Sequence, residues 1–538
     1  MNTPTQQQLN AQARLQAQAA MEGLAVKPTA RVEYRSHGRV AIIGTMEALE
    51  FAPRLQDKHK TTVVLVSGAE EPSTAVIPLA GRPLAIQGYL GNFTLRLGIE
   101  GKPNYETLNV DLVLDLSPQP QLSMPLPPLG YLHSGIDEDS LQQAQAQLDE
   151  LTGTFEKPRF FDYDASICAH ARSGKSGCNA CIEACPAEAI TSLAEAIEVN
   201  PYLCQGGGIC TSVCPTGAIR YNYPSAADML QRIRTLLQVY REKHGQQPII
   251  LVVAEDDLPK ISQVAPNVLT VLVEEVASVG LDIWLSTLAY GAKQIRLFAG
   301  GSIPANVITA LQAQLTTARE ILHGLGYPDD AVQLIGDINT EYGVETMMPD
   351  IPAASYAGFN EKRRVMFMAI DHLYQHGQPA EAILSLSAGA PFGTIAVNAR
   401  TCTLCLSCTS VCPTHAVYAG NEEPMLVFDE SRCVQCGICA AACPEQAITL
   451  TPRLLADPLQ RQQHVTLHHE EPLCCIRCGK PFATQSVVNA MLAKLGNHWM
   501  FQSERARQRL LMCDDCRVAD IVQDPEAMAA GVLDQRRQ

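Results

Sequence analysis

The first 167 residues of this 538-residue chain contain no cysteine, although the whole chain has 20. An excess of basic residues is also missing: the formal net charge is −16 at pH 7, which argues against a protein that binds nucleic acid. The sequence has no signal peptide, no twin-arginine motif near its start and no apolar run of membrane-spanning length. We therefore expect a cytoplasmic protein without membrane insertion.

The cysteines that are present lie in three groups, at 168–214, 402–443 and 474–516. A reducing cytosol disfavours disulfides, so cysteines clustered in this way indicate metal ligands. Within the first two groups one phrase occurs four times. The copies read CNACIEACPAEAI from Cys178, CQGGGICTSVCPTGAI from Cys204, CTLCLSCTSVCPTHAV from Cys402 and CVQCGICAAACPEQAI from Cys433.

The complete spacing, C-x2-C-x2-C-x3-C-P, is typical of bacterial two-cluster ferredoxins. Three thiolates of one loop bind one iron–sulphur cluster, and the fourth cysteine binds the other cluster. The group at 402–443 holds two complete copies and so predicts two 4Fe–4S clusters. Their expected ligands are Cys402, Cys405, Cys408 and Cys443 for one, and Cys433, Cys436, Cys439 and Cys412 for the other.

The group at 168–214 departs from this pattern twice. Lys175 stands where one copy needs its first cysteine, and we expect Cys168 to replace it across the Gly- and Ser-rich loop that follows. The second departure is Gly207, which takes the position of Cys436 in the later copy. The predicted ligand sets are Cys168, Cys178, Cys181 and Cys214 for a 4Fe–4S cluster, and Cys185, Cys204 and Cys210 for an incomplete site.

Three interpretations of the Gly207 site remain open. A 3Fe–4S cluster needs only three thiolates and is compatible with the spacing that is left. A 4Fe–4S cluster could take water or another side chain at its fourth iron. The third interpretation is an empty site in a module that has lost one cluster.

The third cysteine group contains two C-x2-C pairs, in CCIRCGKPF and MCDDCR. Four thiolates in two such pairs are typical of a structural zinc site, which leaves no coordination position open. The expected ligands are Cys475, Cys478, Cys513 and Cys516. A rubredoxin-like iron or another cluster is the alternative.

The pattern of apolar residues predicts a multidomain chain of α/β and α+β parts. RVAIIG and TTVVLVSG resemble strands of a first α/β domain, whereas PIILVVAE, NVLTVLVE and QIRLFAG predict a doubly wound α/β domain further on. The predicted divisions are a helical tail (1–35), an N-terminal α/β domain (36–155), a first ferredoxin-like module (156–222), a second α/β domain (223–345), a helical linker (346–395), a second ferredoxin-like module (396–452) and a zinc-ribbon-like domain (465–538).

Three resemblances follow from these residues. The four cysteine phrases resemble the bacterial dicluster ferredoxins over 160–222 and 396–450. NVLTVLVEEVASVGLDIWLSTLAYGAKQIRLFAGG resembles the delta subunit of methyl-viologen-reducing hydrogenase, but Glu274, Glu275 and Ala299 stand near the positions of that family's cysteines, so only its fold is implied. CAHARSGKSGCNAC, SAGAPFGTI and CIRCGKPF, in this order, resemble cytosolic iron–sulphur proteins associated with formate dehydrogenase, in which the position of Gly207 is a cysteine.

The leading hypothesis is an iron–sulphur electron-transfer protein that serves a redox enzyme, with formate dehydrogenase as the partner implied by resemblance. No catalytic residues are predicted, because no nucleophile–base pair or phosphate-binding loop stands out. A maturation or redox-sensing protein for such an enzyme is one alternative. An oxidoreductase subunit with a flavin or nicotinamide site is the other, although the G-x-G-x-x-G fingerprint is absent.

Overall fold

The computed structural model of the chain describes residues 5–525, apart from 28, 68–74, 104, 262–263, 302, 338–346, 421–422, 496–497, 499–500 and 502. The chain forms two compact units. The first unit consists of residues 1–165, 179–322 and 327–376, and the second of residues 166–178, 323–326 and 377–538. In the part of the chain that is described, no helix has the length and hydropathy of a membrane-spanning segment.

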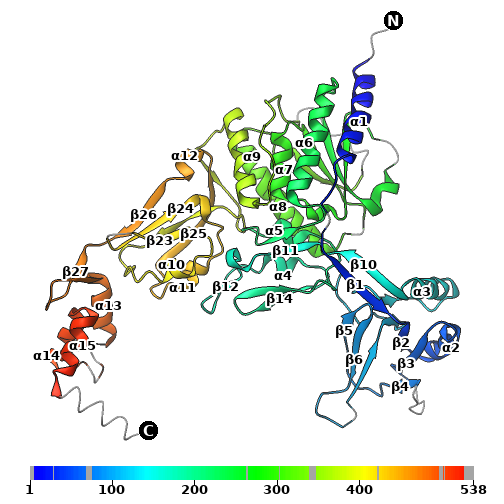
Figure 1. The fold of residues 1–538 in the computed structure, drawn as a ribbon, viewed down its shortest axis with the longest axis horizontal. Helices are drawn as coiled ribbons and strands as arrows, with labels where there is room; N and C mark the ends of the chain where they lie inside the picture. The colour runs from blue at the N-terminus through cyan, green and yellow to red at the C-terminus, as the bar shows by residue number, and fades with distance from the viewer. Residues whose placement is uncertain are drawn as a thin grey trace. The chain divides into compact units, whose positions relative to one another are not determined.

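The N-terminal α/β domain of the first unit is built on a five-stranded parallel sheet in the order β4-β3-β2-β8-β9. Its strands are β2 (Arg39–Gly44), β3 (Lys60–Leu65), β4 (Val76–Pro78), β8 (Leu112–Asp115) and β9 (Tyr131–His133). Helices α2 (Met46–Leu55) and α3 (Glu138–Glu150) lie beside this sheet (Figure 1).

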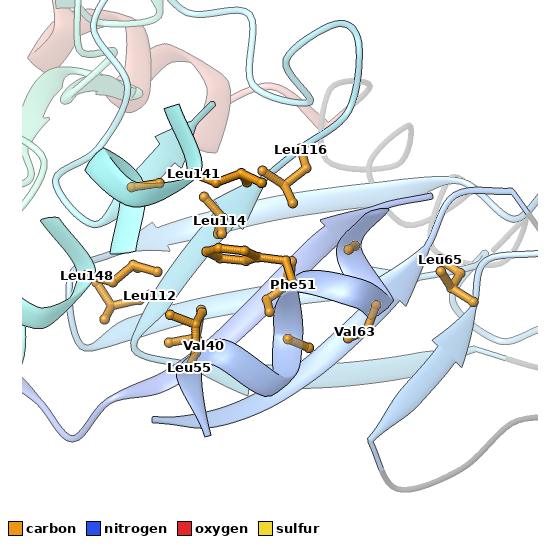
Figure 2. Close-up of a cluster of buried hydrophobic side chains, with 14 of the residues drawn as sticks. Val40, Phe51, Leu55, Val63, Leu65, Leu112, Leu114, Leu116, Leu141 and Leu148 are labelled. Atoms are coloured by element: carbon orange, nitrogen blue, oxygen red, sulfur yellow. The ribbon is translucent and has the colours of Figure 1, made fainter. Parts of the chain in front are cut away.

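One face of this sheet packs against the two helices, as Figure 2 shows. Phe51 and Leu55 of α2 and Leu141 of α3 lie over apolar side chains of the three central strands. The strand residues in this cluster are Val40 and Ile42 of β2, Val63 and Leu65 of β3, and Leu112 and Leu114 of β8. Burial of these side chains is the main source of the domain's stability.

The other face of the sheet carries a second apolar cluster, which includes Phe93, Leu95 and Leu97. These residues belong to a three-stranded antiparallel sheet of β5 (Leu84–Tyr89), β6 (Asn92–Leu97) and β7 (Glu106–Val110). Each side of the five-stranded sheet is therefore covered, which agrees with its continuous buried strands.

The predicted helical tail is only partly helical. Helix α1 (Gln6–Glu22) buries Ala13, Ala17 and Met21 and packs on α6 (Ala226–Glu242). The end of the predicted tail is a strand instead, because β1 (Arg31–Ser36) alternates exposed and buried residues and pairs antiparallel with β10 (Gly153–Pro158).

The second α/β domain has a four-stranded parallel sheet in the order β18-β17-β19-β20. The chain winds outward from the central β17 in both directions, as the predicted doubly wound pattern requires. The strands are β17 (Ile249–Ala254), β18 (Val268–Val273), β19 (Gln294–Phe298) and β20 (Val332–Ile335), and the helices α6, α7 (Leu281–Ala289), α8 (Ala305–Gly324) and α9 (Lys362–His376). Helix α7 packs between α6 and α9 (Figure 1).

Most of the first module lies in the first unit. Its two cysteine phrases contain helices α4 (Ala180–Ala184) and α5 (Ile209–Val213). Strands β14 (Ile190–Leu193) and β15 (Ala196–Val199) connect the two copies, while β11 (Phe161–Tyr163) pairs with β16 (Ile219–Tyr221). The module packs directly on the second α/β domain, because the hydroxyl of Ser212 donates to the carbonyl of Ala277 at 2.6 Å.

The second unit contains the second module, whose two copies surround α10 (Ser407–Val411) and α11 (Ile438–Ala442). Strands β23 (Val417–Ala419) and β24 (Met425–Asp429) connect them, and β22 (Gly393–Val397) pairs with β25 (Ile448–Leu455). The hairpin of β12 (Ala171–Arg172) and β13 (Lys175–Ser176) belongs to this unit and packs on α11. A Cβ on Gly177 would lie 2.4 Å from a side-chain carbon of Ile438, so glycine permits this contact.

The predicted helical linker and C-terminal domain need correction at their edges. The linker contains α9, but its later part includes strand β21 (Ile383–Ser385), which pairs with β25 of the second module. Strand β26 (His464–His469) pairs with β24, so residues 465–469 extend the module's sheet. Helix α12 (Pro458–Arg461) precedes the C-terminal domain. The domain contains β27 (Pro472–Cys474), β28 (Pro481–Thr484), α13 (Gln485–Leu495), α14 (Glu504–Gln508) and α15 (Asp514–Val522). Residues 526–538 lie outside the described part of the chain.

We expect Phe51→Ala to destabilise the N-terminal α/β domain by about 3–5 kcal/mol, because it empties the centre of a cluster that buries this ring almost completely. Met46→Ala, in the same helix but at a side chain that is 48% exposed, should change stability by no more than about 0.5 kcal/mol. Hydrogen exchange of peptides from β2 and β3 measures the difference. Equal protection in the two variants would contradict this account of the core.

Candidate metal centres

The four cysteine phrases have similar backbone conformations. A five-residue helix ends immediately before the cysteine of each Cys-Pro pair. Three positions after that cysteine, φ is positive in every copy, at Glu188, Gly217, His415 and Gln446. Because residues other than glycine rarely adopt this conformation, its recurrence at one position indicates that the same turn is built four times.

In the second module, the first predicted ligand set converges on one cavity. Cys402, Cys405, Cys408 and Cys443 all line it. Burial, followed by the thiols of Cys402 and Cys405, raises the pKa of Cys408 to about 12. The main-chain N–H of Ala447 donates to the sulphur of Cys443 at 3.3 Å.

The other predicted set of this module also comes together. Burial and then the thiols of Cys436, Cys433 and Cys412 raise the pKa of Cys439 to about 12. The main-chain N–H of Ala416 donates to the sulphur of Cys412 at 3.3 Å, and the side-chain amide of Gln435 donates to Cys433 at 3.3 Å. N–H groups aimed at sulphur stabilise thiolates, which are the form that binds metal.

Carboxylates stand beside the cavity of Cys402. Glu445 lines it. Glu470 is among the groups that raise the pKa of Cys402, after burial and two neighbouring thiols. Glu470 accepts a hydrogen bond from the main-chain N–H of Ser486 at 3.3 Å and lies 3.2 Å from His468, which fixes its position.

In the first module, the three cysteines of the incomplete set line a cavity of their own. Cys185, Cys204 and Cys210 share it with Gly207 and with apolar side chains of Leu126, Phe161 and Ile209. Burial, and after it the neighbouring thiols, raises the pKa of Cys210 well above its ordinary value. Such thiols stay protonated until a metal displaces their protons, so this donor set fits an iron–sulphur cluster held by three cysteines.

The loop around Gly207 has the geometry of a cluster loop. Gly206 and Gly208, which flank it, have φ values of 85° and 68°. The residues that flank Cys436 and Cys405 have positive φ as well, namely Gln435, Gly437, Leu404 and Leu406. Gly207 therefore occupies the backbone place of a ligand, and a Cβ there would meet no heavy atom within 4 Å.

Side chains of the β1–β10 pair and of β16 hold this loop. The hydroxyl of Tyr34 donates to the carbonyl of Tyr202 at 2.6 Å, and that of Tyr221 donates to the carbonyl of Gly206 at 2.8 Å. The ammonium of Lys157 donates to the carbonyl of Cys204 at 2.6 Å and to that of Tyr202 at 3.1 Å. Burial lowers the pKa of Lys157 to about 8, which leaves it mostly protonated at neutral pH.

Sequence reasoning missed these supports because nothing near Tyr34 or Lys157 marks them as partners of a loop about 50 to 170 residues away. The sequence predicts only a stiff linker for the proline-rich stretch at 117–130. This stretch also forms part of the site: Leu126 lines the cavity, and the side-chain amide of Gln205 donates to the carbonyl of Pro127 at 2.7 Å.

The four cysteines of the predicted 4Fe–4S set of the first module are divided between the two units of the chain. Cys168 and Cys178 belong to the second unit, whereas Cys181 and Cys214 belong to the first. Their common cluster stays a prediction. Within the first unit, the ammonium of Lys362 donates to the carbonyl of Cys214 at 3.1 Å and to that of Ser212 at 2.5 Å.

The four cysteines of the C-terminal domain come together as the spacing predicts. The sulphur atoms of Cys475, Cys478, Cys513 and Cys516 all lie within 4.8 Å of one another. The first pair follows β27, and the second stands at the start of α15. Cys474, the neighbouring thiol, is exposed and is outside this group. A group of this size and composition can hold one metal ion.

Comparison with known proteins agrees with this geometry. Residues 401–448 match the family model described as the 4Fe-4S dicluster domain, and residues 197–220 match the 4Fe-4S binding domain. The second match includes Gly207. Ferredoxin-3 of Chlorobaculum tepidum is 38% identical over 53 residues, which cover 9% of this chain and 82% of that protein. The chain thus belongs, through its cysteine modules, to the ferredoxin family of iron–sulphur proteins.

Larger relatives share only these segments. One of the polypeptides of polysulfide reductase from Wolinella succinogenes is 37% identical over 94 residues, or 16% of this chain and 49% of that protein. The thiosulfate reductase electron transfer subunit of Salmonella typhi is 46% identical over 46 residues, or 9% of this chain and 23% of that protein. The chain spans about half the length of the former and a quarter of the latter. The expectation of a mixed α/β protein with two ferredoxin-type modules is confirmed.

We expect Gly207→Cys to supply a fourth ligand to the three-cysteine site. The substituted residue needs no positive φ and meets open space, so the loop can accept it without rearrangement. Anaerobically purified variant should contain about one more iron per chain than the parent and should lose any signal of an oxidised 3Fe–4S cluster, as measured by metal analysis and EPR.

Gly208→Cys is the matched control for this substitution. It adds the same thiol one position away, but a Cβ there would lie 2.5 Å from Ser278 on a backbone with φ of 68°, so it should gain no iron. If Gly207→Cys also gains none, the iron content of the parent decides between the other two interpretations: four irons at this site indicate a 4Fe–4S cluster with a ligand other than cysteine, and no iron indicates an empty site.

Proposed function

We propose that this protein carries electrons between redox partners through iron–sulphur clusters in its two ferredoxin-type modules. The observation that carries this proposal is that thiols of the predicted ligand sets line common cavities at sites where the backbone repeats the same turn. Each cluster, when bound, takes up or releases one electron at a time. The chain's own residues bind the clusters, exclude water from them and set their electrostatic surroundings.

The cluster inventory that we propose follows the ligand sets. Cys402, Cys405, Cys408 and Cys443 hold one 4Fe–4S cluster, and Cys433, Cys436, Cys439 and Cys412 hold another. A third 4Fe–4S cluster takes Cys168, Cys178, Cys181 and Cys214. The site of Cys185, Cys204 and Cys210 holds a cluster with one protein ligand fewer.

The partner that we propose is a redox enzyme. Support comes from the names of two relatives, one a polypeptide of polysulfide reductase and the other an electron transfer subunit of thiosulfate reductase. Formate dehydrogenase is the partner suggested by the resemblance of CAHARSGKSGCNAC and CIRCGKPF. The second α/β domain, whose sequence resembles the hydrogenase delta subunit, lies next to the first module.

Reversible reduction tests the function. Anaerobically purified protein should be reduced stepwise by dithionite and reoxidised by a viologen dye, with EPR signals that return after each cycle. Co-purification with a redox enzyme whose electron transfer depends on the reduced protein identifies the partner. Clusters that are lost during the first cycle, or that never accept an electron, would rule out a carrier.

Cys443→Ser tests the crossed ligand sets within the same experiment. Because Cys443 lines the cavity of Cys402, the variant should lose the cluster of Cys402 and keep that of Cys433. Cys412→Ser is the matched control and should do the reverse, since Cys412 lies with Cys439. Loss of the opposite cluster in either variant would show that the sets are not crossed.

We further propose that the C-terminal group of four cysteines binds zinc as a structural ion. With all four positions filled by cysteine, no coordination place is left for a substrate. Removal of the metal by a chelator should raise hydrogen exchange throughout β27, β28 and α15, while the redox cycle of the two modules persists. A rubredoxin-like spectrum with reversible iron reduction at this site would contradict the assignment.

A further inference from the structure

We propose that Lys157 raises the reduction potential of the three-cysteine site, so that the first module is the end of this protein that receives electrons. This inference rests on the proposed electron-transfer function and adds a direction to it. It starts from one cation in the first unit, Lys157, and two carboxylates in the second unit, Glu445 and Glu470.

Lys157 brings a positive charge to the loop that carries Cys204. Its ammonium lies 2.6 Å from the carbonyl oxygen of that cysteine and 4.8 Å from the centre of the Tyr34 ring, which together keep the side chain in place. Lys157 is also among the groups that act on the Cys204 thiol, where it favours the thiolate. The neighbouring carboxylate of Glu156 pairs instead with Arg31, on the other face of the β1–β10 ribbon.

A cation in this position favours the reduced state of the site. Reduction adds one negative charge, and a fixed positive charge in surroundings of low dielectric constant stabilises the added charge more than it does the oxidised site. If the site holds a 4Fe–4S cluster, the missing thiolate at Gly207 acts in the same direction, because the ligand set loses one negative charge while the core keeps its own. If it holds a 3Fe–4S cluster, an iron cation is missing too, and the effect comes from Lys157. Carboxylates oppose this effect: Glu188 acts on the Cys185 thiol, and Glu274 and Glu275 act on Tyr221, whose hydroxyl donates to the carbonyl of Gly206.

The second module has the opposite charge next to its Cys402 site. Glu445 lines that cavity, and Glu470 acts on the Cys402 thiol as a negative charge. Lys494 pairs with Glu445 at 3.0 Å but is itself 65% exposed, so water screens its charge. The ligand set there also keeps all four thiolates, which makes the Cys402 site harder to reduce than a 4Fe–4S cluster that has only three.

These charges together give the electron flow a direction. Electrons pass spontaneously from the site of lower potential to the site of higher potential. The Cys402 site of the second module should therefore be oxidised by the Cys185–Cys204–Cys210 site of the first. One electron is lost by the former and gained by the latter, and the charges of Lys157 and Glu470 stay unchanged.

The test is a potentiometric titration of the full-length protein followed by EPR, with the signal of each site identified by its loss in Cys210→Ser or Cys405→Ser. In the parent protein the three-cysteine site should have the higher potential. Lys157→Gln, which keeps an N–H donor but removes the charge, should make reduction of that site about tenfold less favourable, a shift of about 59 mV for one electron. The potential of the Cys402 site should not change.

Two control variants separate charge from structure. Lys157→Arg keeps the cation and should keep a potential close to that of the parent. Arg31→Met removes the same charge from the same ribbon, but at a side chain that is 72% exposed, and should leave the potential in place. Glu470→Gln should raise the potential of the Cys402 site alone.

Each contrary outcome has a distinct meaning. An unchanged potential in Lys157→Gln, an equal shift in Arg31→Met, or a Cys402 site of higher potential would overturn the inference while electron carriage stands. A three-cysteine site without a cluster in the parent protein would overturn both the inference and that part of the proposed function. If Lys157→Gln fails to fold, the order of potentials in the parent still decides whether the first module receives electrons.

Discussion

Convergence of thiols in apolar surroundings is the constraint on which both modules depend. Thiols that are close together and shielded from water resist ionisation, so their pKa values rise, as they do for Cys408, Cys439 and Cys210. Such a group gives up its protons only to a cation that compensates all of the negative charges at once. The short helices, the repeated left-handed turns and the flanking strand pairs serve to hold the sulphur atoms in this arrangement.

The first module keeps that arrangement where it has lost a ligand. Gly206 and Gly208 retain the conformations that flank a cluster cysteine elsewhere, and three hydrogen bonds from Tyr34, Tyr221 and Lys157 fix the loop. These hydrogen bonds keep the loop in the conformation of a cluster-binding loop although position 207 supplies no thiolate. The supporting side chains come from the β1–β10 ribbon and from β16, so the N-terminal part of the chain contributes to a site in which it has no cysteine.

Sequence reasoning reached the features that depend on local spacing. The position of Gly207, the grouping of Cys475 with Cys513 and the strands of both α/β domains are encoded in short stretches with a clear period. Features that depend on tertiary pairing were missed. Strands β21 and β26 are mostly exposed, β1 buries only alternate residues, and each of the three pairs with a strand that is distant in sequence. The contact of Lys157 with Cys204 has no sequence signal of its own for the same reason.

The division of the chain between the two units has a consequence for its synthesis. Residues 166–178 belong to the second unit, but most of that unit begins only at residue 377. As the ribosome makes the chain, this early segment, with Cys168 and Cys178, is followed by about 260 further residues before its packing surface on α11 (Ile438–Ala442) exists. At typical synthesis rates the delay is on the order of 10–50 s, during which the two thiols lack the surface of α11 that later packs on their hairpin.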